Sequence, residues 1–193
     1  MINIVLFGPP GSGKGTQAQF LIDKFNLKQI STGDLFRYNM KNDTELGKLA
    51  KSYIDKGELV PDQVTIDMLI DELKKPTSAQ GFIFDGFPRT ATQTQALETI
   101  VEEVLQAPID ICLSLIVEDK ILVERLLKRG ETSGRSDDSN EEIIQNRIQE
   151  YYTKTAEVAE LYKQQGKYVE INGVGEIEEI SQKLFAEVEK IKK

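Results

Sequence analysis

Hydrophobic residues along the chain alternate between short, almost continuous runs and longer stretches with a helical period. The short runs predict strands, and three of them are apolar nearly throughout, which is typical of a parallel sheet covered by helices on both faces. The expected strands are Ile2–Phe7, Lys28–Ser31, Gly81–Asp85, Ile109–Val117 and Lys167–Ile171. The expected helices are Thr16–Phe25, Asp62–Lys74, Thr92–Leu105, Glu118–Lys128, Glu141–Gln165 and Glu176–Ile191. This alternation predicts an α/β fold with a mostly parallel sheet.

Two intervals interrupt the alternation. Residues 32–60 hold two short helical patterns and no convincing strand, and residues 130–140, "GETSGRSDDSN", are polar, with glycines and no apolar anchor. Loops on a rigid α/β scaffold often carry function, so both intervals are candidate parts of a site.

Composition and charge exclude several classes of function. The 193 residues suggest one main domain with inserted segments, and the net charge of −8 opposes non-specific binding to nucleic acid or anionic membranes. The chain has no histidine, and Cys112 in the apolar run "IDICLSLIV" is its only cysteine. These counts exclude an intrachain disulfide, a Cys/His zinc site and histidine acid–base catalysis, and they favour a core role for Cys112. The opening "MINIVLF" resembles neither a targeting signal nor a membrane span, so we expect a cytoplasmic protein.

The chemistry-bearing motif is the glycine-rich stretch "GPPGSGKGTQ", which follows the first expected strand and leads into a helix. Gly8 to Lys14 matches the first seven positions of the phosphate-binding pattern GxxxxGK[ST] in the context that the pattern requires. Glycines let successive backbone N–H groups turn toward one anion, and Lys14 supplies a full charge to the outer phosphates. In many nucleotide hydrolases a Ser or Thr directly after the lysine binds Mg²⁺. Here Gly15 follows Lys14 and the first hydroxyl side chain is that of Thr16, so this role is not assumed.

The loop variant and three further motifs resemble the adenylate kinase family of nucleoside monophosphate kinases. The further motifs are "STGDLFR" (31–37), "GELVPD" (57–62) and "DGFPRTATQ" (85–93), and "RLLKRGETSGRSDD" (125–138) resembles the hinge and lid of the short-lid type. The likeness covers the whole chain in order. It implies a P-loop NTPase-type five-stranded parallel sheet forming a core of residues 1–31, 61–129 and 141–193. It also implies an acceptor-binding domain at 32–60 and a short lid at 130–140.

Arginine usage supports a phosphoryl-transfer site independently of the family. Only six of the 24 basic residues are arginines, and they all lie in or beside the nucleotide motifs. A guanidinium grips phosphate in a bidentate way that lysine does not match. The six are Arg37, Arg89, Arg125, Arg129, Arg135 and Arg147.

The resemblance implies reversible transfer from Mg·ATP to AMP, giving two ADP, by a monomer that needs Mg²⁺ and no zinc. Lys14, Arg89, Arg129, Arg135 and Arg147 would act on the transferring group, and Asp85 would orient Mg²⁺ through water. The residues implied for ATP are Gly11, Ser12, Gly13, Lys14, Gly15, Thr16, Arg125, Arg129 and Gly175. Those implied for AMP are Thr32, Arg37, Glu58, Leu59, Val60, Gly86, Phe87, Pro88, Arg89, Gln93, Arg135 and Arg147. Thr32 and Gln93 would recognise the adenine base of AMP.

Several positions keep two interpretations at this stage. Asp137 and Asp138 either stabilise a closed lid through arginines or are solvated loop carboxylates. Thr32 also suits the N-cap of a helix, and Asp85 also suits a helix cap at the end of a strand. Tyr38, Tyr151 and Tyr152 are expected to pack on helix faces.

Three other functions remain as alternatives. A UMP/CMP kinase and a kinase that uses GTP as donor would share the fold and mechanism. A nucleotide-dependent switch is less favoured, because no NKxD segment occurs and Pro88 stands where a DxxG motif starting at Asp85 needs glycine.

Overall fold

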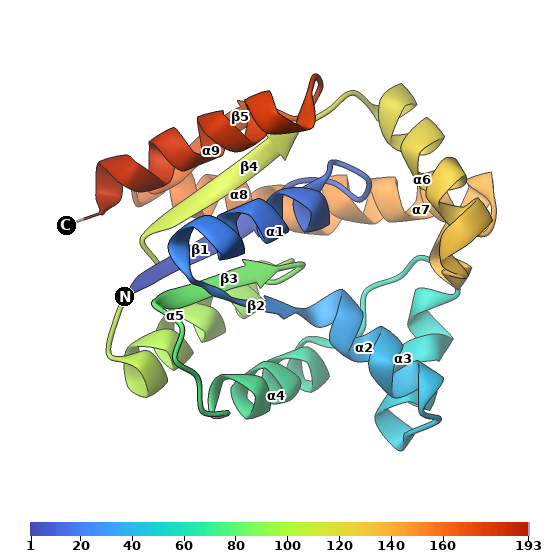
Figure 1. Ribbon diagram of the computed structural model, residues 1–193. Helices are drawn as coiled ribbons and strands as arrows, with labels where there is room; N and C mark the ends of the chain where they lie inside the picture. The colour runs from blue at the N-terminus through green and yellow to red at the C-terminus, as the bar shows by residue number, and fades with distance from the viewer. Residues whose placement is uncertain (193) are drawn as a thin grey trace.

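A parallel sheet forms the centre of the molecule. The structure is a computed structural model that describes residues 1–192, so Lys193, the last residue of the expected core segment, lies outside the described residues. Within this range one sheet has the strand order β2-β3-β1-β4-β5, with every neighbouring pair parallel (Figure 1). The strands are β1 (Ile2–Phe7), β2 (Lys28–Ser31), β3 (Gly81–Asp85), β4 (Ile111–Ile116) and β5 (Tyr168–Asn172). The predicted α/β fold is therefore confirmed.

Helices cover both faces of the sheet, which explains why its strands are apolar on both sides. One face packs against α1 (Lys14–Phe25) and α9 (Ile177–Ile191), and the other against α4 (Asp62–Leu73), α5 (Ala91–Leu105) and α8 (Ala156–Gln164). Alternate residues of β1 enter the two cores: Ile4 and Leu6 face α1 and α9, whereas Val5 and Phe7 face the other helices.

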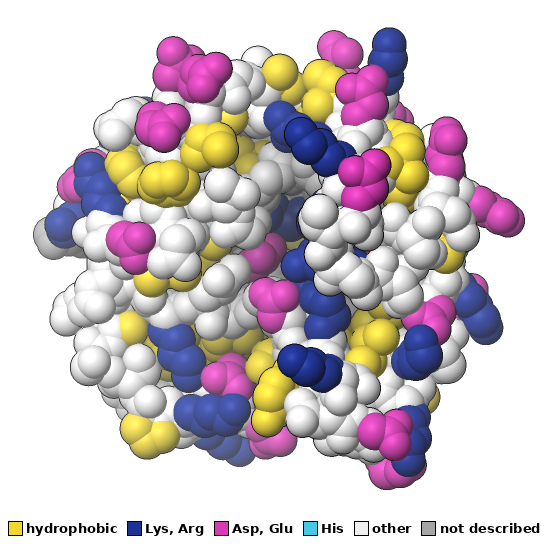
Figure 2. Space-filling model, turned by 45° about the vertical axis from the view of Figure 1, so that its right-hand side comes forward, with side chains coloured by type: hydrophobic (Ala, Val, Ile, Leu, Met, Phe, Trp, Pro, Cys, Tyr) yellow, Lys and Arg dark blue, Asp and Glu magenta, His cyan; other side chains and the backbone are white. Residues whose placement is uncertain are grey.

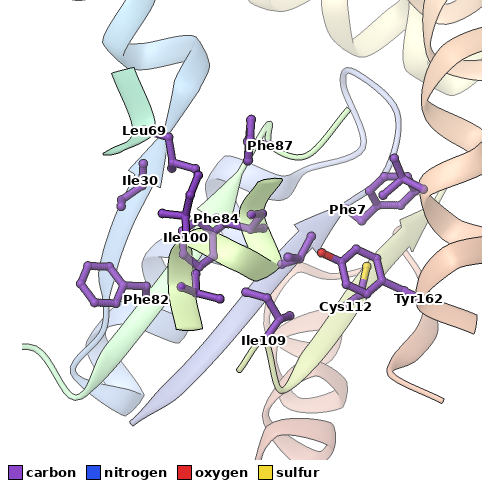
Figure 3. Packing of buried hydrophobic residues seen from close by; sticks show 14 of the residues in the cluster. Phe7, Ile30, Leu69, Phe82, Phe84, Phe87, Ile100, Ile109, Cys112 and Tyr162 are labelled. Atoms are coloured by element: carbon purple, nitrogen blue, oxygen red, sulfur yellow. The ribbon is translucent and has the colours of Figure 1, made fainter. Parts of the chain in front are cut away.

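Figure 3 shows the second of these cores. Phe82 and Phe84 of β3 lie among side chains from neighbouring helices, including Leu69, and Cys112 lies beside Tyr162. Burial raises the pKa of the Cys112 thiol far above its usual range. The prediction that Cys112 is a core residue is confirmed, since its side chain is fully buried.

The remaining helices surround the carboxyl ends of the strands, where open α/β sheets bind their ligands. Helices α2 (Thr32–Lys41) and α3 (Glu45–Ile54) confirm the two helical patterns within residues 32–60, and they share a small core with α4. Helix α6 (Asp119–Ser133) packs on α7 (Glu141–Glu150) through a separate apolar cluster. The short 3-10 turn η1 (Ser136–Asp138) connects these two helices.

Helix α6 is longer than expected and occupies part of the interval that we expected to be a lid loop. It runs to Ser133 rather than Lys128 and ends on Gly134, whose φ of 64° lies in the left-handed region. Gly130 lies inside this helix and does not end it. Its missing side chain leaves room for the chain that returns after the helix, since a Cβ on Gly130 would lie 2.3 Å from the carbonyl oxygen of Asp138.

The expected single helix over Glu141–Gln165 is wrong in one detail. A π-helical turn, η2 (Tyr151–Thr155), separates α7 from α8. At this turn Tyr151 packs against Phe7 with ring centroids 5.7 Å apart, and Thr155 is buried. Such turns often occur at functional sites, and both residues line the cleft described below.

The expectation that three tyrosines pack on helix faces holds for Tyr151 and in part for Tyr152, whose ring packs edge-on against that of Tyr151 with centroids 5.3 Å apart. Tyr38 is 66% exposed, and Tyr152 is 46% exposed with its hydroxyl donating a hydrogen bond to Asp119 Oδ1 at 2.6 Å. Within residues 1–192, none of the helices is both long enough and apolar enough to cross a bilayer.

Candidate active site

A cavity of about 730 Å³ lies at the carboxyl ends of β1, β2 and β3, enclosed by α2, α6 and α7. Figure 2 shows that this face of the molecule is hollowed and that Lys and Arg side chains gather inside the hollow. All the predicted site residues line this cleft except Asp138, including all six arginines. The fold thus brings segments from residue 11 to residue 175 to one place.

The glycine loop occupies the turn between β1 and α1, and its backbone requires glycine. Gly8, Gly11 and Gly13 have φ values of 133°, 82° and 101°, which other residues rarely adopt. A Cβ on Gly8 would also lie 2.6 Å from the carbonyl oxygen of Leu115. Helix α1 begins at Lys14 without a side-chain cap, so its first N–H groups and the positive end of its dipole face the cleft.

Two side chains of the loop are set for anion contact. The ammonium of Lys14 donates to the carbonyl oxygens of Gly8 at 2.8 Å and Pro9 at 3.0 Å. Burial lowers the pKa of Lys14; the charge of Asp85 opposes this and the nearby arginines add to it, which leaves the pKa at about 8. The hydroxyl of Ser12 is buried and has no hydrogen-bond partner among the described residues. Buried hydroxyls normally have partners, which makes Ser12 a candidate ligand contact.

Two carboxylates hold two of the arginines. Asp138 is fully buried and accepts hydrogen bonds from Arg129 Nε at 2.6 Å and Nη2 at 3.0 Å, and it also pairs with Arg147. Asp137 pairs with Arg147 at 3.1 Å. Burial alone would raise the pKa of Asp138, but the hydrogen bond from Arg129 and the surrounding arginine charges outweigh it, so the pKa lies below its usual value. The alternative of solvated loop carboxylates is therefore wrong for both residues.

Residues 130–140 touch residues 32–60 across the mouth of the cleft. Ser136 Oγ donates to Asp55 Oδ1 at 2.6 Å, and Arg135 lies 3.8 Å from Asp34. From α7, Asn146 Nδ2 donates to the carbonyl oxygen of Lys56 at 2.6 Å. These contacts cover the cleft on the side opposite the sheet.

The side of the cleft formed by α2 and α5 is organised around Gly86. Its carbonyl oxygen accepts hydrogen bonds from Thr32 Oγ1 at 2.9 Å and from Arg89 Nε at 2.7 Å. Burial, reinforced by the charge of Arg147, lowers the pKa of Arg89 to about 10, a value at which it stays charged near neutrality. Thr32 is not the N-cap of α2, because Ser31 holds that position and accepts a hydrogen bond from the Asp34 N–H.

Asp85 ends β3 inside the cleft. It is 9% exposed, and its Oδ2 accepts a hydrogen bond from Gln29 Nε2 at 3.1 Å rather than capping a helix. The next helix along the chain, α5, has Thr90 as its N-cap, so the helix-cap alternative for Asp85 is wrong.

Sequence reasoning missed three contributors. Asp34 pairs with Arg37 at 2.6 Å, one helical turn away, a spacing that could have indicated the pair. Gly173 offers its carbonyl oxygen to Arg125 at 3.1 Å, and Tyr151 lines the cleft from the π turn. The last two depend on tertiary packing and leave no local signal.

Comparisons with known proteins agree with this geometry. The family model for adenylate kinase matches residues 6–167. An adenylate kinase of Flavobacterium psychrophilum is 56% identical over 184 residues, covering 95% of this chain and 96% of the relative. Those of Flavobacterium johnsoniae and Parabacteroides distasonis are 52% and 49% identical, each covering at least 99% of this chain and all of the relative. These relatives confirm the predictions that the protein is a kinase and that its nucleotides are ATP and AMP. They do not favour the alternatives of a UMP/CMP kinase or a nucleotide-dependent switch. The chain belongs to the adenylate kinase family.

Proposed function

We propose that the cleft transfers the γ-phosphoryl group of Mg·ATP to AMP, reversibly, with the residues named from the sequence in the implied roles. The observation that carries this proposal is the convergence of Lys14 and six arginines on one cavity. AMP already presents a largely ionised phosphate oxygen, since the second pKa of such a phosphate is about 6. No general base is needed, so the site must position two anions and neutralise charge in the transition state.

The donor phosphates are proposed to lie on the glycine loop, against the N–H groups at the start of α1 and the ammonium of Lys14. Arg129 and Gly175 would meet the donor's adenine, and Arg125 would face its phosphates. The position of Arg125 is supported by its hydrogen bond to Gly173, which directs it from α6 toward the loop after β5.

The acceptor is proposed to lie between α2 and α5. Arg37 and Arg89 would hold its phosphate, while Thr32 and Gln93 would face its base with the backbone of residues 58–60 and 86–88. Arg135 and Arg147 would clasp the transferring group from the opposite side. The carboxylates of Asp137 and Asp138 support this role, because they orient Arg147 before any ligand binds.

Asp85 is the proposed partner of Mg²⁺. No cluster of three or more His, Cys, Asp or Glu side chains suited to a metal occurs within residues 1–192, so the protein by itself forms no metal cage. Mg²⁺ commonly binds through one or two carboxylates together with substrate phosphates, and one buried carboxylate in the cleft fits that pattern. When bound, the ion would neutralise phosphate charge. Asp85 would hold it through water.

The domain division follows from these roles. We propose residues 32–60 as the acceptor-binding domain, residues 130–140 as a short lid, and residues 1–31, 61–129 and 141–193 as the core. Most of the apolar cluster shared by α2, α3 and α4 lies within residues 32–60, which supports the first of these assignments, and Met68 of α4 joins this cluster to the core. We also propose a cytoplasmic monomer that binds neither nucleic acid nor membranes, in line with the net charge of −8.

The choice of acceptor tests the proposal. ADP formation from Mg·ATP should be fast with AMP and slow with CMP, UMP or GMP, each measured at the same concentration. A preference for CMP or UMP would overturn the roles of Thr32 and Gln93 while leaving the phosphate-binding roles intact.

The affinity for Mg·ATP should fall as the pH rises above about 8. Lys14 has a lowered pKa of about 8 in the free protein, so above this pH its amine becomes neutral and loses its attraction for the donor phosphates. Binding measured by calorimetry between pH 6.5 and 9.5 checks this expectation. In Lys14→Met the affinity should be weaker and nearly independent of pH, and an equally steep dependence in that variant would contradict the role of Lys14.

A further inference from the structure

Asp62 lies behind Gln93, just outside the residues that line the cleft. Gln93 is 2% exposed and lines the cleft, whereas Asp62, in the first turn of α4, does not. Asp62 Oδ1 accepts a hydrogen bond from Gln93 Nε2 at 2.8 Å, and Oδ2 accepts one from Thr90 Oγ1 at 3.1 Å. Both carboxylate oxygens of Asp62 therefore accept hydrogen bonds from side chains at the N-terminus of α5.

These contacts fix which way the Gln93 amide points. A carboxylate only accepts hydrogen bonds and a backbone N–H only donates them. Gln93 Nε2 donates to Asp62, and Gln93 Oε1 accepts from the N–H of Arg89 at 2.7 Å. Turning the amide over would set its NH₂ against the Arg89 N–H and its oxygen against the Asp62 carboxylate, so the reversed orientation is disfavoured at both ends.

The fixed amide leaves one hydrogen on Nε2 and one lone pair on Oε1 for a ligand. The edge of adenine offers an acceptor at N1 beside a donor on N6, which matches a donor and an acceptor held in this order. Hypoxanthine and guanine carry the opposite polarity, with a donor at N1 beside an acceptor at O6. A 6-oxopurine would need the reversed amide.

We propose that Asp62 is a positioning residue that fixes the polarity of the Gln93 amide and so makes the acceptor site select 6-aminopurine over 6-oxopurine nucleotides. This inference rests on the proposed function, in which Gln93 faces the acceptor base. If Asp62 only joined α4 to α5, its loss would lower kcat/KM for all acceptor nucleotides by the same factor. If it fixes the polarity of the Gln93 amide, its loss changes the ratio of kcat/KM between 6-aminopurine and 6-oxopurine acceptors.

The test compares AMP with IMP, which differ only at this edge of the base. The wild type should favour AMP strongly in kcat/KM. Asp62→Ala removes the acceptor facing Gln93 Nε2 and should lower the AMP/IMP ratio of kcat/KM about tenfold, the effect of one lost hydrogen bond. Asp62→Asn keeps a carbonyl oxygen that can accept from Nε2 and should retain most of the selectivity.

Asp67→Ala is the matched control, because it removes an exposed carboxylate from the same helix, and among the described residues only Gln63 donates a hydrogen bond to it. An unchanged AMP/IMP ratio in Asp62→Ala would overturn the inference, even if both rates fell. If the alanine variant does not fold, Asp62→Ser suits the first turn of a helix and is too short to reach Gln93. Absence of AMP turnover in the wild type would instead overturn the proposed function.

Discussion

Replacing Arg89 with lysine should lower kcat/KM for AMP by about 10³-fold, the lower end of the range for arginines that stabilise phosphoryl transfer. Arg89 Nε is committed to the carbonyl oxygen of Gly86, which leaves its two terminal nitrogens to grip phosphate as a fork. Lysine keeps a positive charge but has no fork. The burial that lowers the pKa of Arg89 to about 10 would also lower that of a lysine, which starts from a lower value.

A substitution of Arg89 is a sharper test than one of Arg147, because within residues 1–192 no carboxylate forms an ion pair with Arg89. Arg147 pairs with Asp137 and Asp138, so its loss would mix effects on catalysis and on stability. The affinity for Mg·ATP is the internal control in Arg89→Lys and should stay close to that of the wild type. A loss of less than tenfold in kcat/KM for AMP would contradict the role given to Arg89.

Asp138→Ala should lower the free energy of unfolding by about 2 to 3 kcal/mol at neutral pH. The typical cost of breaking a buried ion pair is about 3 to 5 kcal/mol, and a smaller loss is expected here because the Arg129 side chain is 35% exposed and can be rehydrated. The lid should also lose order, since Asp138 joins Arg129 of α6 to Arg147 of α7. Urea unfolding of both proteins measures the difference.

The dependence on pH provides a second readout for Asp138. Its folded pKa lies below the ordinary value of 3.8, so its contribution to stability is complete above that value and disappears as the pH falls through the folded pKa. The stability difference between wild type and Asp138→Ala should therefore narrow below about pH 4. Glu131→Ala, which removes an exposed carboxylate of α6 without an ion-pair partner among the described residues, should change stability by less than about 0.5 kcal/mol. Equal effects of the two substitutions would contradict the pairing.

The parts of the site that sequence could predict are those set by local backbone chemistry. The glycine loop between a strand and a helix is one such part, because residues other than glycine rarely adopt the φ values found at Gly8, Gly11 and Gly13. The arginine positions are another, since five of the six lie within short motifs, Arg147 follows the last motif, and all six line the cleft. The continuous apolar strands likewise predicted the parallel sheet and its cover of helices.

The remaining features depend on residues that meet only after folding. The sequence left two interpretations open for Asp137 and Asp138, and only the approach of α6 and α7 makes them partners of Arg129 and Arg147. The π turn that begins at Tyr151 is not visible in the helical period of the sequence. Its packing against Phe7 joins residues that are far apart in the chain, so this contact also required the structure. Asp62 and Gln93 belong to different helices, and their contact required the structure.

Consumption of Mg·ATP with and without AMP tests the central claim most directly, namely that one covered cleft transfers phosphoryl groups to AMP and keeps water out. ATP labelled at the γ position follows the group itself. We expect the label to pass into ADP when AMP is present and almost no inorganic phosphate to form when AMP is absent. Release of labelled inorganic phosphate at the same rate with and without AMP would contradict the account.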